Sequence, residues 1–502
     1  MSNMIWQEVL GMKLSVLLAG IELLGQNLRE DPEIGGICYS SREVQPQMLF
    51  VAIPGYHTDG HQFIAEAAAR GAAAVLCQRA PEDQTIPYLQ VADTRAAMAQ
   101  AAARFYRNPA RRLTILGVTG TNGKTTTTYL LKAMLEGVLG ARVGLIGTNQ
   151  NLIGDRALPA VRTTPESLDL QRLLAQMEKA GCTHVVMEVS SHALMLGRVD
   201  GILFERAVFT NLTRDHLDFH QTMEAYRAAK GRLFAQCKKA VYNLDDAAGQ
   251  FYFRQKLCPA ITYSENKNEA DVVAKNIRLF SDRVVFEAVA LGEIGRIELP
   301  IPGGFTIYNA LGAIACGLSL GLPLSGIRRA FKHAAGVRGR IEVVPLEADF
   351  TVLIDYAHTP NALENILMTV RRFTKGRVLL LFGCGGDRDR SKRPIMGAIG
   401  AELSDFVMVT SDNPRTEPPE EIIKDILAGM QGLSTPYQVE ADRRRAIRAI
   451  LDLAQPGDTV VLAGKGHELY QVIGTEVRPL DERMEVAAWA AGRRKDAGGN
   501  EA

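Results

Sequence analysis

The stretch Leu113-Thr-Ile-Leu-Gly-Val-Thr-Gly-Thr-Asn-Gly-Lys-Thr-Thr-Thr-Thr128 decides how the middle of this chain folds. Its first part, Leu113 to Val118, is apolar and rich in β-branched residues, as expected of a buried strand. A loop with three glycines follows, and the spacing of apolar residues becomes helical from Tyr129 to Leu135. A strand, a glycine loop, Lys-Thr and a helix form the layout of a phosphate-binding loop.

The side chains of this loop suit ATP. Glycines allow backbone N–H groups to close around phosphate oxygens, and the N-terminus of the following helix adds positive potential. Lys124 would neutralise the outer phosphates and Thr125 would reach Mg²⁺. The common spacing G-x-x-x-x-G-K-T requires glycine where Val118 stands, so this loop is a variant with glycines at 117, 120 and 123. Its predicted ATP contacts are Gly120, Thr121, Asn122, Gly123, Lys124, Thr125 and Thr126.

Size and composition limit the class of protein. A chain of 502 residues suggests about three domains. With 47% hydrophobic and 23% charged residues it needs no large disordered part, and a net charge of +1 argues against nucleic-acid binding driven by overall phosphate attraction. The seven scattered cysteines include no C-x-x-C pair, which indicates reduced thiols. The apolar segment 14–21 is too short for a membrane span, so we expect an amphipathic helix in a cytoplasmic protein without membrane insertion.

The order of elements predicts an α/β protein with three domains. Residues 1–110 mix short strands with Ala-rich helices in a small module, and residues 111–336 form a parallel sheet of the P-loop ATPase kind around the phosphate loop. In residues 337–502, helical segments separate apolar strands, which predicts a doubly wound, Rossmann-like parallel sheet. The four strands are 350–354, 378–382, 406–410 and 460–463.

Each of these four strands runs into a polar loop. Because the carboxyl ends of parallel strands share one edge of a sheet, the loops should line a ligand crevice. The run Gly383-Cys-Gly-Gly386 alone is a weak dinucleotide motif, and no acidic residue follows at the expected place. We therefore reject NAD binding.

Titratable residues also follow the central strands. Glu188 ends an apolar run that begins at Val185, and a carboxylate there, beside a phosphate loop, is well placed to hold Mg²⁺. The next strand, 207–210, ends in a loop crowded with polar residues, Asn211 to His220. We assign no role to His220, because a lone histidine is more often structural. By periodicity alone, Lys230 is a surface lysine of a helix over 222–236.

The loop Asp412-Asn-Pro-Arg415 discriminates best between substrates. An arginine fork binds a carboxylate with two hydrogen bonds, whereas Asp412 and the Asn413 carbonyl suit an ammonium group. Together these residues would hold the zwitterionic end of an amino acid. The alternative, a proline turn with solvated charges, is less favoured by the composition of the loop.

Several motifs together resemble those of the Mur ligase family and its folylpolyglutamate synthase relatives, which use ATP to join a carboxylate to an amine. The resemblance covers essentially the whole chain and is strongest to MurE-type members. The motifs are Gly120-Thr-Asn-Gly-Lys-Thr-Thr126, Asn211-Leu-Thr-Arg-Asp-His-Leu-Asp218, Ala229-Lys-Gly-Arg-Leu-Phe234 and Asp412-Asn-Pro-Arg415.

This resemblance implies roles for residues that periodicity leaves unassigned. His216 would help to hold a second Mg²⁺, and Lys230 would be carbamylated by CO₂, which turns its amine into a metal-binding carboxylate. Burial near cations would lower the lysine pKa and so supply the neutral amine that this reaction needs. The implied catalytic residues are Lys124, Glu188, His216 and Lys230, and the implied metal ligands are Thr125, Glu188, His216 and Lys230 as carbamate.

Substrate contacts follow from the same resemblance. Asn309 would lie near adenine, although an amide near a helix start serves nearly as well as a cap, and Arg340 and Asp355 would also contact ATP. The N-terminal module would hold the UDP end of UDP-MurNAc-L-Ala-D-Glu, with Ser41 in a motif that departs from the family at Ser40 and Gln47. The other contacts to this substrate would be Thr163, Thr164, Ser190 and Arg198. Those to meso-diaminopimelate would be Arg388, Asp412, Asn413, Pro414, Arg415, Gly464 and Glu468.

The implied reaction adds meso-diaminopimelate to the D-glutamate γ-carboxylate through an acyl phosphate, in a monomer whose domains close. Lysine lacks the distal carboxylate, so lysine in this site would leave Arg415 unpaired at a cost of about 1–3 kcal/mol. Two alternatives remain: a lysine-adding or folate-type ligase, and a catalytically silent binding protein of the same fold. The Asp412–Arg415 loop argues against the first, and the presence of Lys124, Glu188, His216 and Lys230 argues against the second.

Overall fold

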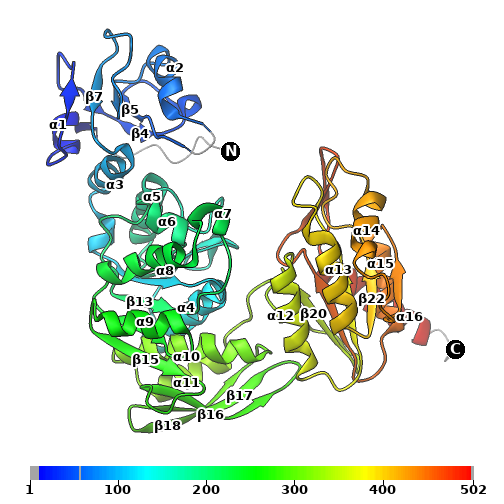
Figure 1. Ribbon diagram of the computed structural model, residues 1–502. Helices are drawn as coiled ribbons and strands as arrows, with labels where there is room; N and C mark the ends of the chain where they lie inside the picture. The colour runs from blue at the N-terminus through cyan, green and yellow to red at the C-terminus, as the bar shows by residue number, and fades with distance from the viewer. Residues whose placement is uncertain (1–10, 56–57, 499–502) are drawn as a thin grey trace. The chain divides into compact units, whose positions relative to one another are not determined.

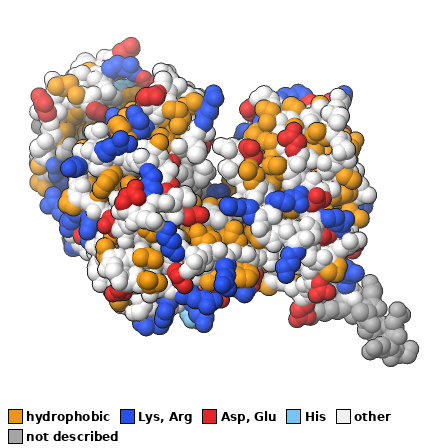
Figure 2. Space-filling model, turned by 60° about the horizontal axis from the view of Figure 1, so that its bottom comes forward, with side chains coloured by type: hydrophobic (Ala, Val, Ile, Leu, Met, Phe, Trp, Pro, Cys, Tyr) orange, Lys and Arg blue, Asp and Glu red, His pale blue; other side chains and the backbone are white. Residues whose placement is uncertain are grey.

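The computed structural model describes residues 11–55 and 58–498, with side chains up to Arg493. The chain divides into two compact units. The first contains residues up to 263 together with 315–322, and the second contains 264–314 and 323–502. Among the described helices, none has both the length and the apolar character needed to cross a membrane. Positive and negative side chains are interspersed over the face shown in Figure 2.

The first unit begins with a five-stranded sheet in the order β2-β7-β6-β5-β4 (Figure 1). The four strands from β4 to β7 are parallel, and β2 is antiparallel at the edge. Helix α1 buries Leu14 and Leu17 against this sheet, which confirms the expected amphipathic helix in a shorter form. The strands are β2 (Gly25–Gln26), β4 (Gly36–Cys38), β5 (Met48–Val51), β6 (Ala74–Cys77) and β7 (Tyr88–Gln90). The helices are α1 (Leu14–Leu17), α2 (Ile64–Ala69) and α3 (Thr94–Phe105), and a further strand pair is β1 (Met12–Lys13) with β3 (Glu33–Ile34).

The phosphate-loop strand β8 (Thr114–Thr119) lies in the middle of the second sheet of this unit, between β12 and β13. The parallel register places Glu188 of β12 beside Val118 and Phe209 of β13 beside Thr119. The loops after all three strands therefore leave the same edge of the sheet. The remaining strands are β9 (Val143–Ile146), β10 (Asn151–Ile153), β11 (Arg156–Leu158), β12 (His184–Glu188), β13 (Arg206–Phe209), β14 (Ala240–Asn243) and β15 (Ala260–Ser264).

Helices follow most of these strands, as parallel connections require. The predicted helix over 222–236 is α-helical only to Gly231 and continues as a 3₁₀ helix, Arg232–Gln236. The helices are α4 (Lys124–Leu139), α5 (Ser167–Lys179), α6 (Ser191–Met195), α7 (Leu217–His220), α8 (Met223–Gly231) and α9 (Ala247–Gln255).

The second unit contains an antiparallel meander and the doubly wound sheet that the sequence predicts. The meander, β16 to β18, packs against α11. In the doubly wound sheet β20, β24, β21, β22 and β23 run parallel in this order, and β19 adds an antiparallel edge. The strands are β16 (Val272–Leu279), β17 (Val284–Ala290), β18 (Glu293–Leu299), β19 (Glu342–Val344), β20 (Thr351–Asp355), β21 (Val378–Phe382), β22 (Phe406–Val409), β23 (Tyr437–Val439) and β24 (Thr459–Ala463).

Alternate residues of this sheet face two separate cores. Leu380 and Phe382 join the core under α12, α13 and α14, whereas Leu379 and Leu381 join the core under α15 and α16. This alternation is the pattern of a sheet that is buried on both faces. The helices are α10 (Gly304–Ser319), α11 (Leu324–Lys332), α12 (Pro360–Arg371), α13 (Lys392–Leu403), α14 (Pro419–Ala428), α15 (Arg443–Leu453) and α16 (Glu482–Gly498), and β25 (Tyr470–Ile473) forms a hairpin with β26 (Glu476–Pro479).

Candidate functional site

The phosphate loop has the backbone that its glycines predict. Gly120 has φ 150° and Gly123, which precedes α4, has φ 83°. A Cβ at Gly120 would overlap with Thr210 Oγ1, so this position has room only for glycine. Lys124 folds over the loop, where its Nζ donates to Gly120 O at 2.9 Å and to Thr121 O at 2.8 Å. The cation that would bind phosphate is therefore held at the loop by backbone carbonyls.

The loop after β13 braces the phosphate loop. Thr210 Oγ1 donates to Asn122 O at 2.6 Å, and Asn122 N donates to Asn211 Oδ1 at 2.9 Å. Thr121 N also donates to Asn211 O at 2.8 Å. The side chain of Asn211, the first residue of the Asn-Leu-Thr motif, therefore fixes the backbone of the phosphate loop.

Lys230 points into the same loop and is not a surface lysine. Only 1% of this residue is exposed, and its Nζ donates to Gly120 O at 2.8 Å. The Nζ also lies 4.5 Å from the centre of the Tyr226 ring. Burial, with repulsion from Lys124 as a smaller cause, holds the pKa of Lys230 well below its ordinary value. The geometry thus favours a neutral, nucleophilic amine beside the expected phosphate position.

Glu188 lies buried at the end of β12, with 1% of the residue exposed. One carboxylate oxygen accepts from Thr148 N at 2.9 Å and the other from Thr148 Oγ1 at 3.1 Å. These bonds hold the carboxylate in one orientation at the edge of the sheet where the phosphate loop also lies.

His216 is half-exposed and has φ 52° in the loop after β13. Its ring centre lies 4.9 Å from that of His192, and its Nε2 lies 3.5 Å from Asp215 Oδ2. Burial is the main cause that lowers the pKa of His216 from its ordinary value; Asp215 opposes this shift and the nearby Lys124 adds to it. A neutral imidazole is the form that binds a metal ion.

In the described part of the chain, no three His, Cys, Asp or Glu side chains come together as a ready metal site. A Mg²⁺ site here therefore needs oxygen ligands of another kind, such as hydroxyl, phosphate or carbamate oxygens. The buried amine of Lys230 and the buried hydroxyl residue Thr125 fit that requirement, because the first would gain a carboxylate on reaction with CO₂.

Four of the expected substrate residues come together beside Glu188. Thr164 Oγ1 donates to the backbone oxygen of Glu188 at 2.9 Å and accepts from Ser190 N at 3.1 Å. Arg198 Nη1 donates to Thr164 O at 3.2 Å, and Thr163 Oγ1 lies 3.1 Å from Thr148 Oγ1. The sequence prediction of Thr163, Thr164, Ser190 and Arg198 as one group agrees with this arrangement.

Sequence reasoning missed Glu166, which belongs to the same group. This buried carboxylate pairs with Arg198 at 2.8 Å and with Arg95 of α3 at 3.2 Å. Arg198, placed between Glu166 and Thr164, is thus fixed by two partners. The only signal in the sequence was the position of Glu166, two residues after the Thr-Thr pair.

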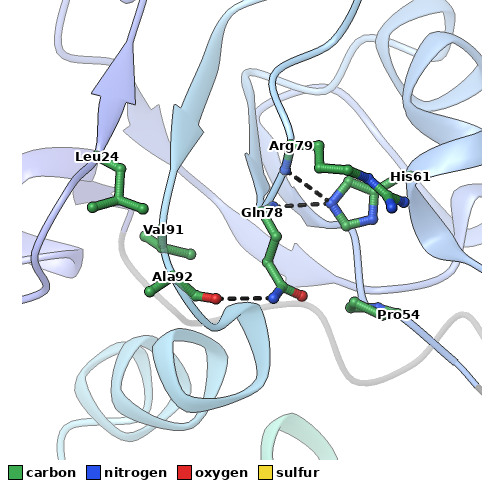
Figure 3. A pocket seen from close by; sticks show the side chains of 7 residues that line it. All are labelled: Leu24, Pro54, His61, Gln78, Arg79, Val91 and Ala92. Atoms are coloured by element: carbon green, nitrogen blue, oxygen red, sulfur yellow. Dashed lines mark hydrogen bonds between the residues drawn. The ribbon is translucent and has the colours of Figure 1, made fainter.

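Ser41 lies elsewhere, at the start of the 3₁₀ helix Ser41–Glu43 that follows β4 of the N-terminal sheet, where its Oγ donates to Glu66 at 3.0 Å. The same sheet has a pocket of about 360 Å³ at the carboxyl ends of β5, β6 and β7 (Figure 3). In this pocket His61 Nε2 accepts from Gln78 N at 2.9 Å, and Gln78 Nε2 donates to Ala92 O at 2.9 Å. The pocket is lined by Leu24, Pro54, His61, Gln78, Arg79, Val91 and Ala92, so Ser41 is not part of its lining.

A buried lysine that the sequence analysis did not single out organises the Asp412–Arg415 loop. Lys465 is fully buried, and its Nζ donates to Asn413 Oδ1 at 2.8 Å and to Glu468 Oε2 at 2.9 Å. Asn413 Oδ1 also accepts from Val472 N at 2.9 Å, and its Nδ2 donates to Glu468. The oxygen of this amide already accepts two hydrogen bonds. In this structure the Asn413 side chain holds the loop, and the expected contact between its carbonyl and a substrate ammonium stays a prediction.

The other expected amino-acid residues surround this network. Arg415 has φ 52°, and its Nη1 donates to Gly386 O at 2.8 Å. Arg388 is exposed, and its Nη1 donates to Asp387 O at 3.1 Å. Gly464 has φ 110°, and a Cβ there would press against Asp412 Oδ2. The structure thus places two arginines and two carboxylates, Asp412 and Glu468, in neighbouring loops.

Three expected ATP residues belong to the second unit. Asp355 ends β20 and accepts from Ile341 N and Ala357 N, both at 2.8 Å, and burial raises its pKa. Arg340 lies 5.2 Å from the centre of the Tyr356 ring, and its buried Nε has no hydrogen-bond partner among the described atoms. Asn309 is buried on α10. Their contact with ATP stays a prediction.

Comparison with known proteins gives the same family for three successive segments of the chain. Residues 33–106 match the model described as "Mur ligase family, catalytic domain", residues 118–317 match "Mur ligase middle domain", and residues 339–466 match "Mur ligase, glutamate ligase domain".

Two curated relatives and two solved structures illustrate this likeness. A UDP-N-acetylmuramoyl-L-alanyl-D-glutamate–2,6-diaminopimelate ligase of Caldanaerobacter subterraneus is 48% identical over 94% of this chain and 98% of its own length. A ligase of the same name from Geobacillus thermodenitrificans is 44% identical over 96% of this chain and 100% of its own. A solved structure with that name has a TM-score of 0.72 at 33% identity and covers 97% of this chain and 100% of its own. The ADP complex of Thermotoga maritima MurF shares the fold, with a TM-score of 0.60 at 17% identity over 92% of this chain and 98% of its own.

Proposed function

Because the chain belongs to the Mur ligase family, we propose that it joins meso-diaminopimelate to UDP-N-acetylmuramoyl-L-alanyl-D-glutamate. It is an ATP-dependent ligase of peptidoglycan precursor synthesis. The similarity to relatives named as diaminopimelate ligases extends over nearly the full length of those relatives. This supports the proposal that diaminopimelate is the amino acid that is added. The new amide forms at the γ-carboxylate of D-glutamate.

The reaction has two transfers, and the residues of this chain act in each. In the first, a γ-carboxylate oxygen attacks the γ-phosphorus of ATP, and ADP leaves. Lys124 and the backbone N–H groups of the phosphate loop neutralise and orient the transferred phosphoryl group. Thr163, Thr164, Ser190 and Arg198 hold the phosphoryl acceptor, the substrate that carries the γ-carboxylate, near Glu188; the gathering of these side chains at that strand end supports this role.

In the second transfer the diaminopimelate amine attacks the acyl carbon, phosphate leaves, and the amine loses a proton. The loop Asp412–Arg415 and Glu468 orient the amino acid for this attack. Much of the rate enhancement comes from positioning, since the reacting groups are otherwise ordinary. The phosphate loop belongs to the first compact unit and the Asp412 loop to the second, so the reaction needs both units.

Magnesium would be held by Thr125, Glu188, His216 and the carbamate of Lys230, and it would supply positive charge for the phosphate oxygens. The low pKa of the buried Lys230 amine supports carbamylation. We further propose that the enzyme is a cytoplasmic monomer with domains 1–110, 111–336 and 337–502, and that the pocket of Figure 3 receives the UDP end of the substrate.

The observation that carries the choice of amino acid is the Asp412–Arg415 loop. Its Arg415 and the neighbouring Arg388 offer cationic forks, whereas Asp412 and Glu468 offer carboxylates for an ammonium group. An amino acid with two zwitterionic ends fits this pairing better than lysine, which would leave one arginine without a carboxylate.

The test is phosphate release from ATP in the presence of UDP-MurNAc-L-Ala-D-Glu and Mg²⁺, with meso-diaminopimelate and L-lysine compared at equal concentrations. Strong turnover with diaminopimelate and at most slow turnover with lysine is the expected result. Preference for lysine would keep the ligase but contradict the role of Arg415. No turnover with either amino acid would favour a silent binding protein of this fold.

A further inference from the structure

Arg393 is a fully buried arginine of α13 that has no assigned role. Its guanidinium donates to both carboxylate oxygens of Glu417 at 2.8 and 2.9 Å, and to Asp425 Oδ2 at 2.9 Å. A fourth bond reaches Gly385 O at 3.3 Å. A buried charge with so many directed partners holds its neighbours in one geometry, because each lost bond would leave a polar group unpaired.

The partners of Arg393 belong to the two loops that carry the expected diaminopimelate arginines. Gly385 lies in the loop after β21, three residues before Arg388, and Glu417 lies two residues after Arg415 in the loop after β22. Glu417 also accepts from Asp387 N, so the carboxylate contacts the residue next to Arg388. One ion pair thus fixes both loops.

The backbones of the two loops are also in direct contact. Gly386 N donates to Asn413 O at 2.9 Å, and Thr416 Oγ1 donates to Asp387 Oδ1 at 2.7 Å. A Cβ at Gly386 would overlap with Pro414 O. The loops after β21 and β22 are therefore packed directly against each other. We expect the Arg393–Glu417 ion pair to keep them in this arrangement.

We propose that the Arg393–Glu417 pair is a positioning unit that sets the separation of Arg388 and Arg415 and so determines the preference for an amino acid with a second carboxylate. This inference rests on the proposed function. Arg388 is exposed and gains its position from its loop backbone, because its described hydrogen bond is to the adjacent Asp387 O. A shift of the loop after β21 would move the Arg388 guanidinium away from the carboxylate of a bound amino acid.

The chemistry of the pair suits this role. A planar guanidinium binds a carboxylate with two parallel hydrogen bonds and so fixes an angle as well as a distance, which a lysine ammonium does not. Hydrogen bonds from Arg393 and from Asp387 N lower the pKa of Glu417 to about 2, so the carboxylate stays ionised at neutral pH.

The test uses the full-length enzyme and two conservative variants, Glu417→Gln and Arg393→Lys. Initial rates are measured with meso-diaminopimelate, L-lysine and ATP varied in turn. For both variants we expect the KM for diaminopimelate to rise about tenfold or more and the ratio of kcat/KM for diaminopimelate over lysine to fall by a similar factor. The KM for ATP should stay near that of the wild type, and both variants should stay folded at the assay temperature although their Tm falls, because the ion pair is weakened or lost. The matched control is Arg371→Ala, which removes an exposed arginine of α12 that pairs with Asp405 and has no described contact with Arg393, Glu417 or Asp425.

Three outcomes would overturn the inference. The first is a Glu417→Gln variant with unchanged diaminopimelate KM and unchanged preference over lysine. The second is a rise in the KM for ATP as large as the rise in the KM for diaminopimelate. The third is loss of folding in both variants. Either of these results would show that the pair supports the domain rather than the amino-acid site. A wild-type enzyme that does not use diaminopimelate would instead contradict the proposed function, and it is recognised before any variant is made.

Discussion

Lys230 brings its amine to the carbonyl of Gly120, inside the loop that is expected to bind ATP. Burial and the nearby Lys124 disfavour the ammonium form, and the Tyr226 ring covers one side of the group. This environment turns a residue type that is normally solvated into a nucleophile that can react with CO₂. In the proposed function the phosphate loop, the carbamate of Lys230 and the carboxylate of Glu188 would supply the charge pattern for phosphoryl transfer.

Replacement of Lys230 by Met should abolish ligation while the fold persists. Methionine keeps the length and burial of the side chain but has no amine to carbamylate, so we expect a rate loss of about 100-fold or more. Phosphate release under saturating substrates is the measurement, and a ¹³C signal of a carbamate in wild-type enzyme supplied with ¹³C-bicarbonate is the independent control. A Met variant with the wild-type rate would refute the role of Lys230.

A second residue-scale prediction concerns Gly120. A Cβ there would overlap with Thr210 Oγ1, and φ 150° is unfavourable for other residues. Gly120→Ala should therefore displace the phosphate loop and weaken ADP binding, measured by calorimetry, by about tenfold or more. Gly140→Ala is the matched control, since Gly140 also has positive φ but no atom within 4 Å of its Cβ position, and it should bind ADP normally. Equal affinities in both variants would contradict the argument.

At the scale of elements, the doubly wound sheet explains why the amino-acid loops lie together. β21, β22 and β24 are parallel neighbours, so the loops at 383–390, 411–417 and 464–468 leave one edge. Each loop begins where a mainly apolar, buried strand ends, which is why the sequence pattern predicts the loops clearly. Their mutual fixation depends on the buried Lys465 and Arg393, which come from a loop and from α13.

The Glu417 carboxylate predicts a pH dependence of stability. Its pKa is lowered from 4.5 to about 2, so between these values the unfolded chain binds more protons than the folded chain. Stability from this group is present above about pH 4.5 and is lost as the pH falls towards 2. Glu417→Gln should therefore show a smaller drop in Tm between pH 5 and pH 3 than the wild type, whereas Glu420→Gln, which changes an exposed carboxylate, should not. An unchanged drop in the Glu417 variant would contradict the assignment.

At the scale of the whole molecule, the C-terminal region has its own core on both faces of its sheet. The clusters around Leu380 and Leu379 contain only residues from 341 onwards. We expect an isolated fragment of residues 337–502 to fold and to unfold in one cooperative transition, measured by circular dichroism. It should not hydrolyse ATP, because it lacks the phosphate loop. A fragment without a cooperative transition would show that the proposed boundary is misplaced.

Much of this protein could be predicted from its sequence, for local reasons. The strand, glycines and Lys-Thr around Gly120 have the layout of a phosphate-binding loop, and the four C-terminal strands have a continuous apolar pattern bounded by polar loops. The fold class and the family follow from such patterns. Boundaries were less certain: the helix expected over 222–236 changes to a 3₁₀ helix at Arg232, and the first helix ends at Leu17, because final turns depend on packing as well as on propensity.

What the tertiary structure alone decided is which polar groups are buried and with whom they pair. Periodicity placed Lys230 on the surface, whereas the fold buries it against Gly120. The Asn413 carbonyl is occupied by Lys465, and Arg198 is fixed by Glu166. These pairings join residues 32 to 110 positions apart, and burial depends on every element that packs around them. A local sequence pattern carries the propensity of a segment but not the identity of its distant neighbours, and those neighbours decide the charge and the chemistry of the site.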